Sequence, residues 1–395
     1  MKILVLSNLY PPHGFGGYEE RCRTSVQGLR ERGHHIQVLT SQVGMARPAP
    51  GPDAEGIWRA LIPVGYFGFP WVRMPGLARV EAHNHARLRT ALAQVGPDAV
   101  WVWNLGGLGK SLLATAAAQV PLVCDLSDEW VLRGLPSDPW LGWSSRHPRW
   151  SRLAGLLARG VPRLRPEELP LGRAYCTSYD LRTRTAAAGF PALARVPVIH
   201  CGIEVERFTA PIHERDDGPL RCLYVGRLHP DKGVHTACAG VAACPQATLD
   251  VYGSGEPDYE ARLRLDWGSH PRIKLRGHVP AGGMPAVYRG YHCLVFPSEW
   301  PEPFALTPLE ASAAGLVVAG TLTGGSGEFL REGDNALTWR AGQADDLTRV
   351  LTRLAAEPEL GRMLASRAQA EVAQRFTLGV MLDAMESHLH ATVGR

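Results

Sequence analysis

The sequence lacks the cysteine spacing, the charge excess and the long apolar runs that mark several large classes of protein. Its eight cysteines are scattered, and no two of them form a C-x-x-C pair. This spacing argues against a disulfide framework and against a zinc site, and it favours a reducing compartment. Lys and Arg total 42 against 38 Asp and Glu, and the resulting net charge of +4 is too mild to indicate nucleic acid as a partner.

Hydrophobic runs are short throughout the chain. The longest candidate for a membrane span, 112–126, is interrupted by Thr115, Gln119 and Asp125. The apolar run at 3–6 is too short for a signal peptide and is expected to form a first buried strand. The sequence therefore predicts a cytoplasmic protein without a membrane-spanning helix.

The length and the order of apolar segments predict two domains. At 395 residues the chain is too long for one ordinary core, so two domains of roughly 180 residues each are expected. Apolar strands alternate with glycine turns and helical segments, which is typical of parallel sheets with helices on both faces. We expect a helix at 17–32 and strands at 2–8, 35–40, 98–104, 121–126, 220–227, 248–252, 272–276, 292–297 and 316–321. The predicted fold class is α/β, with Rossmann-like domains at 1–195 and 196–375.

Two glutamates eight positions apart, Glu302 and Glu310, form the most informative pattern in the chain. Glu302 lies in a proline-rich strand-to-helix loop, and Glu310 is expected about two turns into the helix that follows. A helix N-terminus binds phosphate well, and two carboxylates beside it suit the hydroxyl groups of a sugar and a ribose. The pattern predicts a nucleotide-sugar pocket. Its structural alternative is a capped helix with a surface glutamate.

The glycine turn at 226–233 carries two cations. Gly226 and Arg227 follow a predicted strand, and Lys232 comes five residues later. A diphosphate leaving group gains negative charge as the bond to the sugar breaks, and fixed cations stabilise that charge. Arg227 and Lys232 are therefore predicted to hold the donor phosphates. The alternative is a pair of solvated surface cations.

Gly16 and Gly17 open a helix after the first strand, where glycine lets backbone N–H groups approach a phosphate or a sugar. A simple tight turn would also need glycine here. The segment approaches the dinucleotide fingerprint G-x-G-x-x-G, but Glu19 stands at the last position and would face the pyrophosphate. Residues 104–111 miss a phosphate-binding P-loop by one position, since Asn104 stands where glycine is needed. Both nucleotide-binding alternatives are disfavoured.

Three of these segments, in this order, resemble the retaining glycosyltransferases of family 4, which have the GT-B fold. They are the loop from Asn8 to Gly17, the turn from Gly226 to Gly233, and residues 302–337. The resemblance runs the length of the chain. It implies two Rossmann-like domains with parallel sheets facing across a cleft, and a C-terminal helix at about 376–395 that packs back on the first domain.

The resemblance also implies roles for individual residues. Glu302 would contact the transferred sugar and Glu310 the nucleotide ribose. Backbone groups would hold the sugar and the distal phosphate at Phe304, Ala305 and Leu306, and would face the base at Gly277, His278 and Val279. The family has glycine where Ala305 stands. Phosphate contacts are implied for Gly16, Gly17, Gly226, Arg227 and Lys232.

The acceptor side departs from the family. Many members carry a His-Asp pair after the fourth strand of the first domain, and here Ser127 stands in place of the histidine while Asp128 keeps its place. The acceptor-side candidates are Asp125, Ser127, Asp128, Glu129 and Trp130, whose acidic members could equally cap the next helix. The catalytic set implied is Glu302, Arg227, Lys232 and Asp128.

Residues 140–173 interleave tryptophan and leucine with arginine, a pattern that resembles an interfacial helix on anionic lipid. A basic exposed helix and a lid over the acceptor site are the alternatives, because four prolines break the periodicity. The segment therefore suggests peripheral contact with the inner face of a membrane.

The sequence predicts a retaining glycosyltransferase that moves a hexose-type sugar from a UDP- or GDP-linked donor to a hydroxyl group of a glycan, a lipid-linked acceptor or a small molecule. An Asp-x-Asp pair is absent from the expected site. We therefore expect no metal and no cofactor besides the donor. The alternatives are a nucleotide-sugar epimerase or hydrolase of the same fold and a non-catalytic nucleotide-sugar binder.

Overall fold

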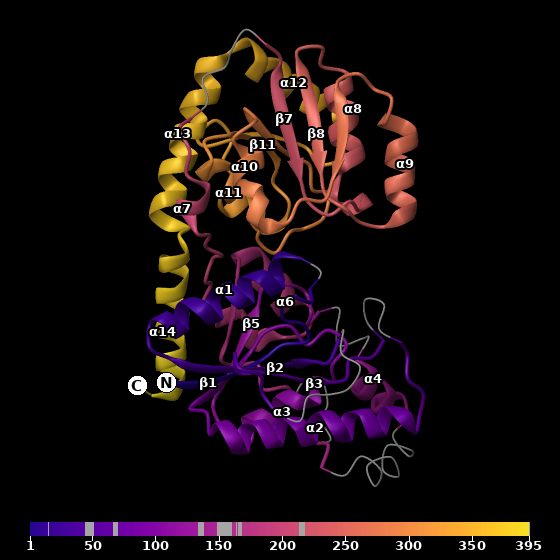
Figure 1. The fold of residues 1–395 in the computed structure, drawn as a ribbon, viewed down its shortest axis with the longest axis vertical. Helices are drawn as coiled ribbons and strands as arrows, with labels where there is room; N and C mark the ends of the chain where they lie inside the picture. The colour runs from indigo at the N-terminus through magenta and orange to yellow at the C-terminus, as the bar shows by residue number, and fades with distance from the viewer. Residues whose placement is uncertain are drawn as a thin grey trace. The chain divides into compact units, whose positions relative to one another are not determined.

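The structure is a computed structural model that describes residues 1–14, 16–43, 51–65, 70–132, 138–147, 160–162, 164, 168–212 and 218–394. The chain divides into two compact units. Unit 1 comprises Met1–Ile199 and Leu382–Arg395, and unit 2 comprises His200–Met381. Each unit is built on one six-stranded sheet (Figure 1). The chain passes from one unit to the other close to the expected boundary at 195/196.

The sheet of unit 1 is parallel throughout, with the strand order β3-β2-β1-β4-β5-β6. Ile3 of β1 is in register with Ile36 on one side and Ala99 on the other. Residues 3–6 are all buried because helices cover both faces, as their unbroken apolar run predicts. The strands are β1 (Lys2–Leu6), β2 (His35–Ser41), β3 (Ile57–Leu61), β4 (Ala99–Val102), β5 (Leu122–Leu126) and β6 (Ala174–Cys176).

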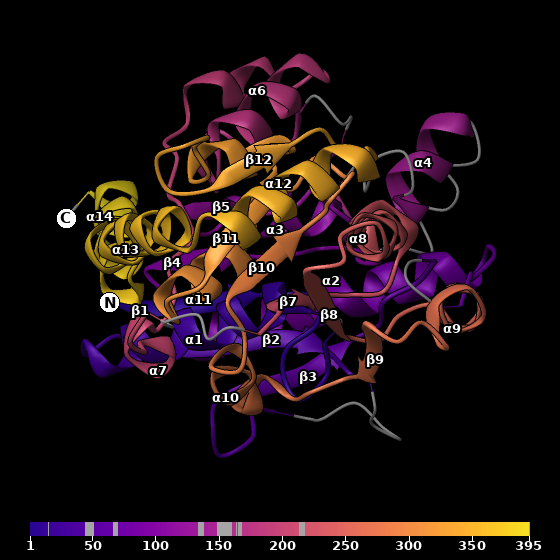
Figure 2. The same ribbon diagram turned by 90° about the horizontal axis from the view of Figure 1, so that it is seen from above.

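Helices α1, α2, α3 and α6 of unit 1 pack against this sheet, and α4 packs against α2. In α1, Cys22, Val26 and Leu29 are fully buried, which confirms the helix expected at 17–32. Figures 1 and 2 both show the C-terminal end of α14 beside β1. The helices are α1 (Gly17–Glu31), α2 (Gly76–Val95), α3 (Ser111–Ala117), α4 (Pro139–Arg146), α6 (Tyr179–Ala187), the 3-10 helix η2 (Pro191–Arg195) and most of α14 (Leu378–Val393).

Unit 2 repeats the design with the order β12-β11-β10-β7-β8-β9, again all parallel. Its strands are β7 (Leu220–Val225), β8 (Ala247–Tyr252), β9 (Ile273–Gly277), β10 (Cys293–Phe296), β11 (Val317–Thr321) and β12 (Leu337–Trp339). Its helices are α7 (Val205–Phe208), η3 (Pro230–Lys232), α8 (Val234–Ala242), α9 (Pro257–Trp267), η4 (Ala281–Gly283), α10 (Met284–Tyr288), α11 (Thr307–Ala313), η5 (Gly324–Glu328), α12 (Ala344–Ala356) and α13 (Pro358–Arg375).

Two apolar clusters cover the two faces of the unit 2 sheet. Successive residues of a strand point to opposite faces, so Cys293 and Val295 join one cluster while Leu294 and Phe296 join the other. The first cluster includes apolar residues of α8 and α12, and the second includes those of α11 and α13. This double cover explains why the strands of unit 2 are apolar on both faces.

The cysteines are part of these cores. All eight side chains are buried thiols, and four of them lie in strands β5, β6, β7 and β10. Burial raises the pKa of the Cys176 thiol to about 12 and that of Cys238 likewise to about 12. Within the part of the chain that the structure describes, no helix has both the length and the apolar character needed to cross a membrane.

Candidate active site

The predicted donor residues gather at one edge of the unit 2 sheet. Parallel strands end on the same edge, and α/β sheets bind ligands there. Gly226 follows β7, Gly277 ends β9 and the loop with Glu302 follows β10. These three strands, with β8, are neighbours in the sheet. Topology therefore brings together three segments that are far apart in the sequence.

Glu302 and Lys232 are in direct contact. The Lys232 ammonium lies 2.5 Å from Oε1 of Glu302, and the hydroxyl of Ser298 donates to the same oxygen at 2.7 Å. The Glu302 side chain is 10% exposed and the Lys232 side chain 23% exposed. A largely buried carboxylate thus holds a cation at the surface of unit 2, beside the carboxyl edge of the sheet.

Two glycines allow the loops around this pair to pack closely. Gly233 has φ +65°, and a Cβ atom there would lie 2.0 Å from the carbonyl oxygen of Pro297. Gly324 has φ +59°, and its Cβ would lie 2.3 Å from the carbonyl oxygen of Glu302. Both positions need a left-handed backbone and leave no room for a side chain. These two glycines therefore fix where Lys232 and Glu302 meet.

Arg227 is the second cation of this edge. It is exposed, and its side chain makes no ion pair with any described residue. The hydroxyl of Tyr224 donates to its carbonyl oxygen at 2.9 Å, which fixes the backbone of the turn. The guanidinium is therefore available to an anionic ligand.

Glu310 lies in the first turn of α11 and not two turns into a helix, because α11 begins only at Thr307. The sequence expectation was wrong on this point, since residues 303–306 stay outside the helix. The hydroxyl of the buried Tyr288 donates to Oε2 of Glu310 at 2.7 Å. Burial raises the pKa of the Glu310 carboxyl, and the bond from Tyr288 opposes that shift.

The remaining donor candidates differ in exposure. Phe304 is buried and packs against His200 and Phe376, with ring centroids 5.1 and 5.8 Å away. Ala305 and Leu306 are half-buried against the same cluster. Gly277 has φ +79° and open space around it, His278 is exposed and Val279 is half-buried. The side chains of Phe304, Ala305, Leu306 and Val279 thus pack at least partly against the core, whereas His278 faces solvent.

A second polar cluster lies in unit 1 and centres on a residue that the sequence did not indicate. Arg21 of α1 forms a buried ion pair with Asp125, 2.8 Å from each carboxylate oxygen, and also contacts the hydroxyl of Ser127. Its guanidinium stacks 4.6 Å from the centre of the Trp103 ring. Asp125 is fully buried and its charge is matched by Arg21, so it is held inside the unit. The sequence could indicate the place of Asp125 near the end of a buried strand, but not its pairing with Arg21.

Asp128 is held by two donors, the side-chain amide of Asn104 and the backbone N–H of Trp130, each at 2.7 Å. Burial raises the pKa of Asp128 to about 7, and the N–H of Trp130 partly opposes this. Glu129 forms an ion pair with Arg184. Trp130 is 1% exposed and donates to the carbonyl oxygen of Asp125. Trp130 is thus part of the core of unit 1, and its place on the acceptor side stays a prediction.

Comparison with known families settles the class of protein. Residues 15–207 match the family described as Glycosyltransferase Family 4, and residues 206–371 match that described as Glycosyl transferases group 1. The chain belongs to the family 4 glycosyltransferases.

Individual relatives agree with this assignment. The glycosyltransferase is 25% identical to a glycogen synthase of Mycobacterium tuberculosis over 390 residues, which cover 95% of this chain and 91% of the relative. It is 23% identical to the sulfoquinovosyl transferase SQD2 of Arabidopsis thaliana, over 90% of this chain and 67% of the relative. Its fold resembles that of sucrose-phosphate synthase from Thermosynechococcus elongatus, with a TM-score of 0.76 at 17% identity and 99% coverage of both chains. Anabaena HepE in complex with UDP-glucose gives a TM-score of 0.70 at 20% identity, covering 99% of this chain and all of that one.

The rival nucleotide sites are not formed in this glycosyltransferase. Lys110, the lysine of the near P-loop, is 1% exposed and donates to the carbonyl oxygens of Leu105 and Leu108. It is therefore withdrawn from any phosphate. At the first loop, Glu19 accepts a hydrogen bond from the N–H of Gly16 at 3.2 Å, so the carboxylate caps α1 where a pyrophosphate would have to sit. Gly16 and Gly17 are exposed, and their role toward the donor stays a prediction.

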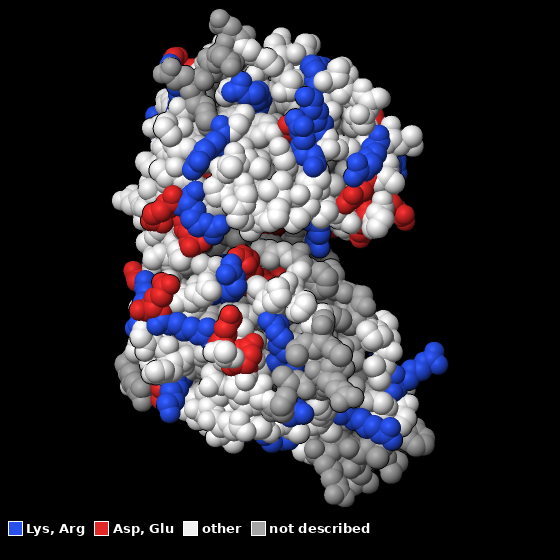
Figure 3. Space-filling model, in the orientation of Figure 1, with Lys and Arg blue, Asp and Glu red and all other residues white. Residues whose placement is uncertain are grey.

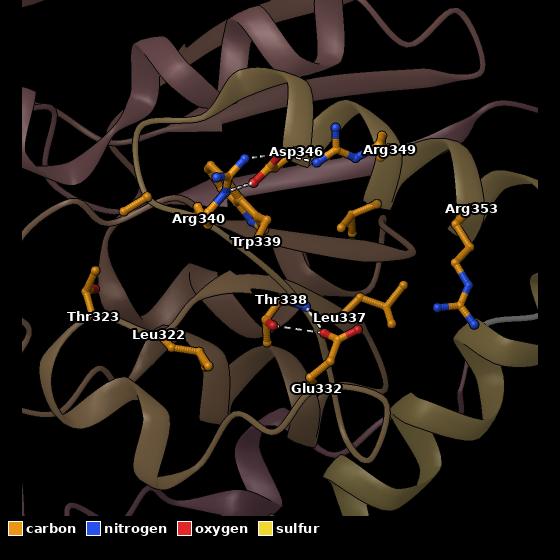
Figure 4. A pocket seen from close by; sticks show the side chains of 12 residues that line it. Leu322, Thr323, Glu332, Leu337, Thr338, Trp339, Arg340, Asp346, Arg349 and Arg353 are labelled. Carbon is orange, nitrogen blue, oxygen red and sulfur yellow. Dashed lines mark hydrogen bonds and ion pairs between the residues drawn. The ribbon is translucent and has the colours of Figure 1, made fainter.

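The glycosyltransferase also has a cavity of about 610 Å³ on the β11–β12 flank of unit 2. Figure 4 shows Arg340 and Arg349 directed to Asp346 and Glu332 directed to Thr338 around it. None of the predicted donor residues lines this cavity. Of its arginines, Arg340 and Arg349 share Asp346, and Arg353 pairs with Glu357 outside the lining.

The surface of the glycosyltransferase bears on the expected membrane contact. In α4, Trp140 and Leu141 are buried and Trp143 packs partly against the core of unit 1, so these side chains are not available to lipid. Residues 148–159, 163 and 165–167 of the predicted interfacial segment lie outside the described residues. Figure 3 shows Lys and Arg mixed with Asp and Glu over the face in view, in keeping with the mild net charge.

Proposed function

We propose that this glycosyltransferase moves a hexose from a nucleoside-diphosphate sugar to a hydroxyl acceptor with retention of the anomeric configuration. The observation that carries the proposal is the contact between Lys232 and Glu302 beside the exposed Arg227, at the edge of a parallel sheet. A diphosphate needs cations and a sugar needs a hydrogen-bond acceptor. Unit 2 offers both within one group of loops.

The cations suit the leaving group. Breaking the bond between the anomeric carbon and the phosphate oxygen leaves a full negative charge on the diphosphate. Arg227 can donate a forked pair of hydrogen bonds and Lys232 supplies a compact charge. Because Glu302 and the fold hold Lys232 in place before the reaction, little reorganisation is needed when that charge develops. We therefore propose that transfer needs no metal ion.

Retention follows from a front-side displacement. The acceptor hydroxyl attacks the anomeric carbon on the face that the diphosphate leaves, and the departing phosphate oxygen takes the acceptor proton. One C–O bond forms, one breaks, and the proton ends on the nucleoside diphosphate. No protein base is needed, so the replacement of the family histidine by Ser127 is compatible with this route. Glu302 is proposed to contact the sugar, Glu310 the ribose, and Ser127 and Asp128 of unit 1 the acceptor.

A UDP-linked donor is the first candidate, and a GDP-linked donor the second. One structural neighbour, Anabaena HepE, was solved with UDP-glucose, and one sequence relative is named as a glycogen synthase. Glucose is therefore the first sugar to test. The acceptor class remains a hydroxyl of a glycan, a lipid-linked molecule or a small molecule.

The test has two stages. Calorimetric titration with UDP, GDP, ADP and dTDP without added metal should reveal one diphosphate that binds clearly more tightly than the others. Incubation with the matching sugar donor and a panel of acceptors, followed by NMR of the product, should give the same anomeric configuration as the donor. An inverted product would overturn the retaining mechanism. Donor consumption without any acceptor would indicate an epimerase or a hydrolase.

A further inference from the structure

A cluster of three potential ligand groups lies in unit 1, apart from every residue assigned to transfer. His34 stands between α1 and β2, and Glu386 and His390 stand one turn apart on α14. One ligand atom from each lies within 4.8 Å of the others. Positions i and i+4 of a helix share one face, so both α14 groups point toward His34.

Each member presents the atom that a metal ion would use. Nδ1 of His34 lies 3.3 Å from the amino nitrogen of Met1, which leaves Nε2 to face Oε1 of Glu386 at 2.7 Å. Arg32 holds the other carboxylate oxygen, Oε2, at 2.8 Å, and Asp383 offsets the charge of Arg32. The hydrogen bonds from His34 and Arg32 keep the pKa of Glu386 below its usual value, so the carboxylate is ionised.

His390 completes the cluster. Its ring lies 5.8 Å from that of His34, and its ring nitrogens make no hydrogen bond with any described residue. It is only half-buried, so an ion and a water molecule could reach it. A half-buried imidazole beside a second imidazole and a carboxylate, with no hydrogen bond to a described residue, has a ring nitrogen available as a ligand.

We propose that His34, Glu386 and His390 bind a divalent transition-metal ion of the Zn²⁺ type, with water as the fourth ligand. Two imidazole nitrogens and one carboxylate oxygen are ligands typical of zinc, whereas Mg²⁺ and Ca²⁺ prefer oxygen. The ligand atoms of a tetrahedral zinc ion stand about 3.3 Å apart. The nitrogen of His34 and the oxygen of Glu386, now 2.7 Å apart, would separate slightly, and His390, whose ligand atom lies within 4.8 Å of theirs, would move closer. The ion replaces the proton between His34 and Glu386.

Such an ion would link α14 to His34, the residue that precedes β2. Because the two helix ligands belong to the last helix and His34 to the start of the chain's second strand, metal binding would stabilise the packing of α14 on unit 1. The site is independent of transfer chemistry. The cysteine pattern could not reveal it, since it contains no cysteine and its members are 352 residues apart.

The test compares two histidines of the same helix. His388 lies two residues before His390, and its Nε2–H donates instead to the carbonyl oxygen of Arg173, 3.1 Å away. The full chain without a polyhistidine tag is treated with EDTA and titrated with Zn²⁺ in a calorimeter. We expect one strong site in the wild type and in His388→Gln, and at least tenfold weaker binding in His390→Gln. At a hundredfold excess over Kd, Zn²⁺ should raise the melting temperature of the first two by roughly 5 °C.

Visible absorption of bound Co²⁺ gives a second measurement, which reports the ligands of the metal ion directly. Co²⁺ in a tetrahedral site gives intense visible absorption, which should appear in the wild type and in His388→Gln and be lost in His390→Gln. Absence of Zn²⁺ binding in the wild type, or equal binding in all three proteins, would overturn the proposal, as would equal losses in both variants. Melting curves without metal show whether each variant is folded.

Discussion

Replacing Lys232 by methionine would separate two effects of its ammonium group, one on stability and one on the donor. The ammonium contacts a carboxylate that is only 10% exposed, while Lys232 itself is 23% exposed. Removing the cation leaves Glu302 with the hydroxyl of Ser298 as its remaining side-chain partner. Losing one member of a fully buried pair costs 3–5 kcal/mol. Because this pair is partly solvated, we expect a loss of about 1–3 kcal/mol.

The effect on the donor should be separate. One charged hydrogen bond to a phosphate is worth about 1.5–3 kcal/mol, so Lys232→Met should weaken binding of the nucleoside diphosphate by roughly 10- to 150-fold. Arg227→Met is the matched control for stability. Arg227 is exposed and makes no ion pair with a described residue, so its loss should weaken diphosphate binding and leave the melting temperature within about 1 °C.

A double variant completes the test. Adding Glu302→Gln to Lys232→Met replaces the unpaired carboxylate by a neutral amide that can still accept from Ser298. Stability should return to within about 1 kcal/mol of the wild type, while diphosphate affinity stays low. Thermal unfolding without ligand and calorimetric titration give the two quantities. A double variant no more stable than Lys232→Met alone would refute the assignment of the pair as a buried ion pair.

Three further predictions concern other parts of the structure. Gly233→Ala should destabilise the protein by about 2–5 kcal/mol, because its Cβ would lie 2.0 Å from a carbonyl oxygen. Gly277→Ala, also at positive φ but in open space, should cost about 1 kcal/mol. Urea unfolding of the two variants compares these losses of stability. Glu302→Gln should lower turnover, measured by steady-state kinetics, far more than diphosphate affinity. Equal losses in both would contradict the proposed contact between Glu302 and the sugar. Asp128 has a folded pKa of about 7, above its usual 3.8, so ionisation of this carboxyl opposes folding. The contribution of protonated Asp128 to the free energy of unfolding is fully present below about pH 4 and is lost as the pH rises through 7. Unfolding curves from pH 4 to 8 should therefore fall less steeply for Asp128→Asn than for the wild type, and parallel curves would contradict the raised pKa.

Long apolar strands and the glycine turns after them could be predicted from the sequence. All nine expected strands needed only shifts of one or two residues at their ends, since a run such as that of β1 is apolar wherever both faces are covered. The strands β3, β6 and β12 were not anticipated. The last two have three residues each, too few to show a periodicity, and β3 carries a half-buried arginine.

The site was predictable in its residue types and not in its contacts. Glu302 and Lys232 were recognised separately, but their contact spans 70 positions and depends on which strands are neighbours. Arg21 gave no signal, because an arginine among the charged residues of a helix is most often solvated. The family resemblance could name the position of Ser127 but not the guanidinium that now contacts its hydroxyl.

The burial of every cysteine has a practical consequence for experiments. A thiol reagent reaches a side chain only when it is exposed and ionised, and all eight thiols are enclosed in the folded units. Labelling of the native protein should therefore report unfolding and little else. A cysteine introduced at an exposed position such as His278 or Arg227 would be the one group modified, so fluorophores or spin labels could be attached without first removing the natural cysteines.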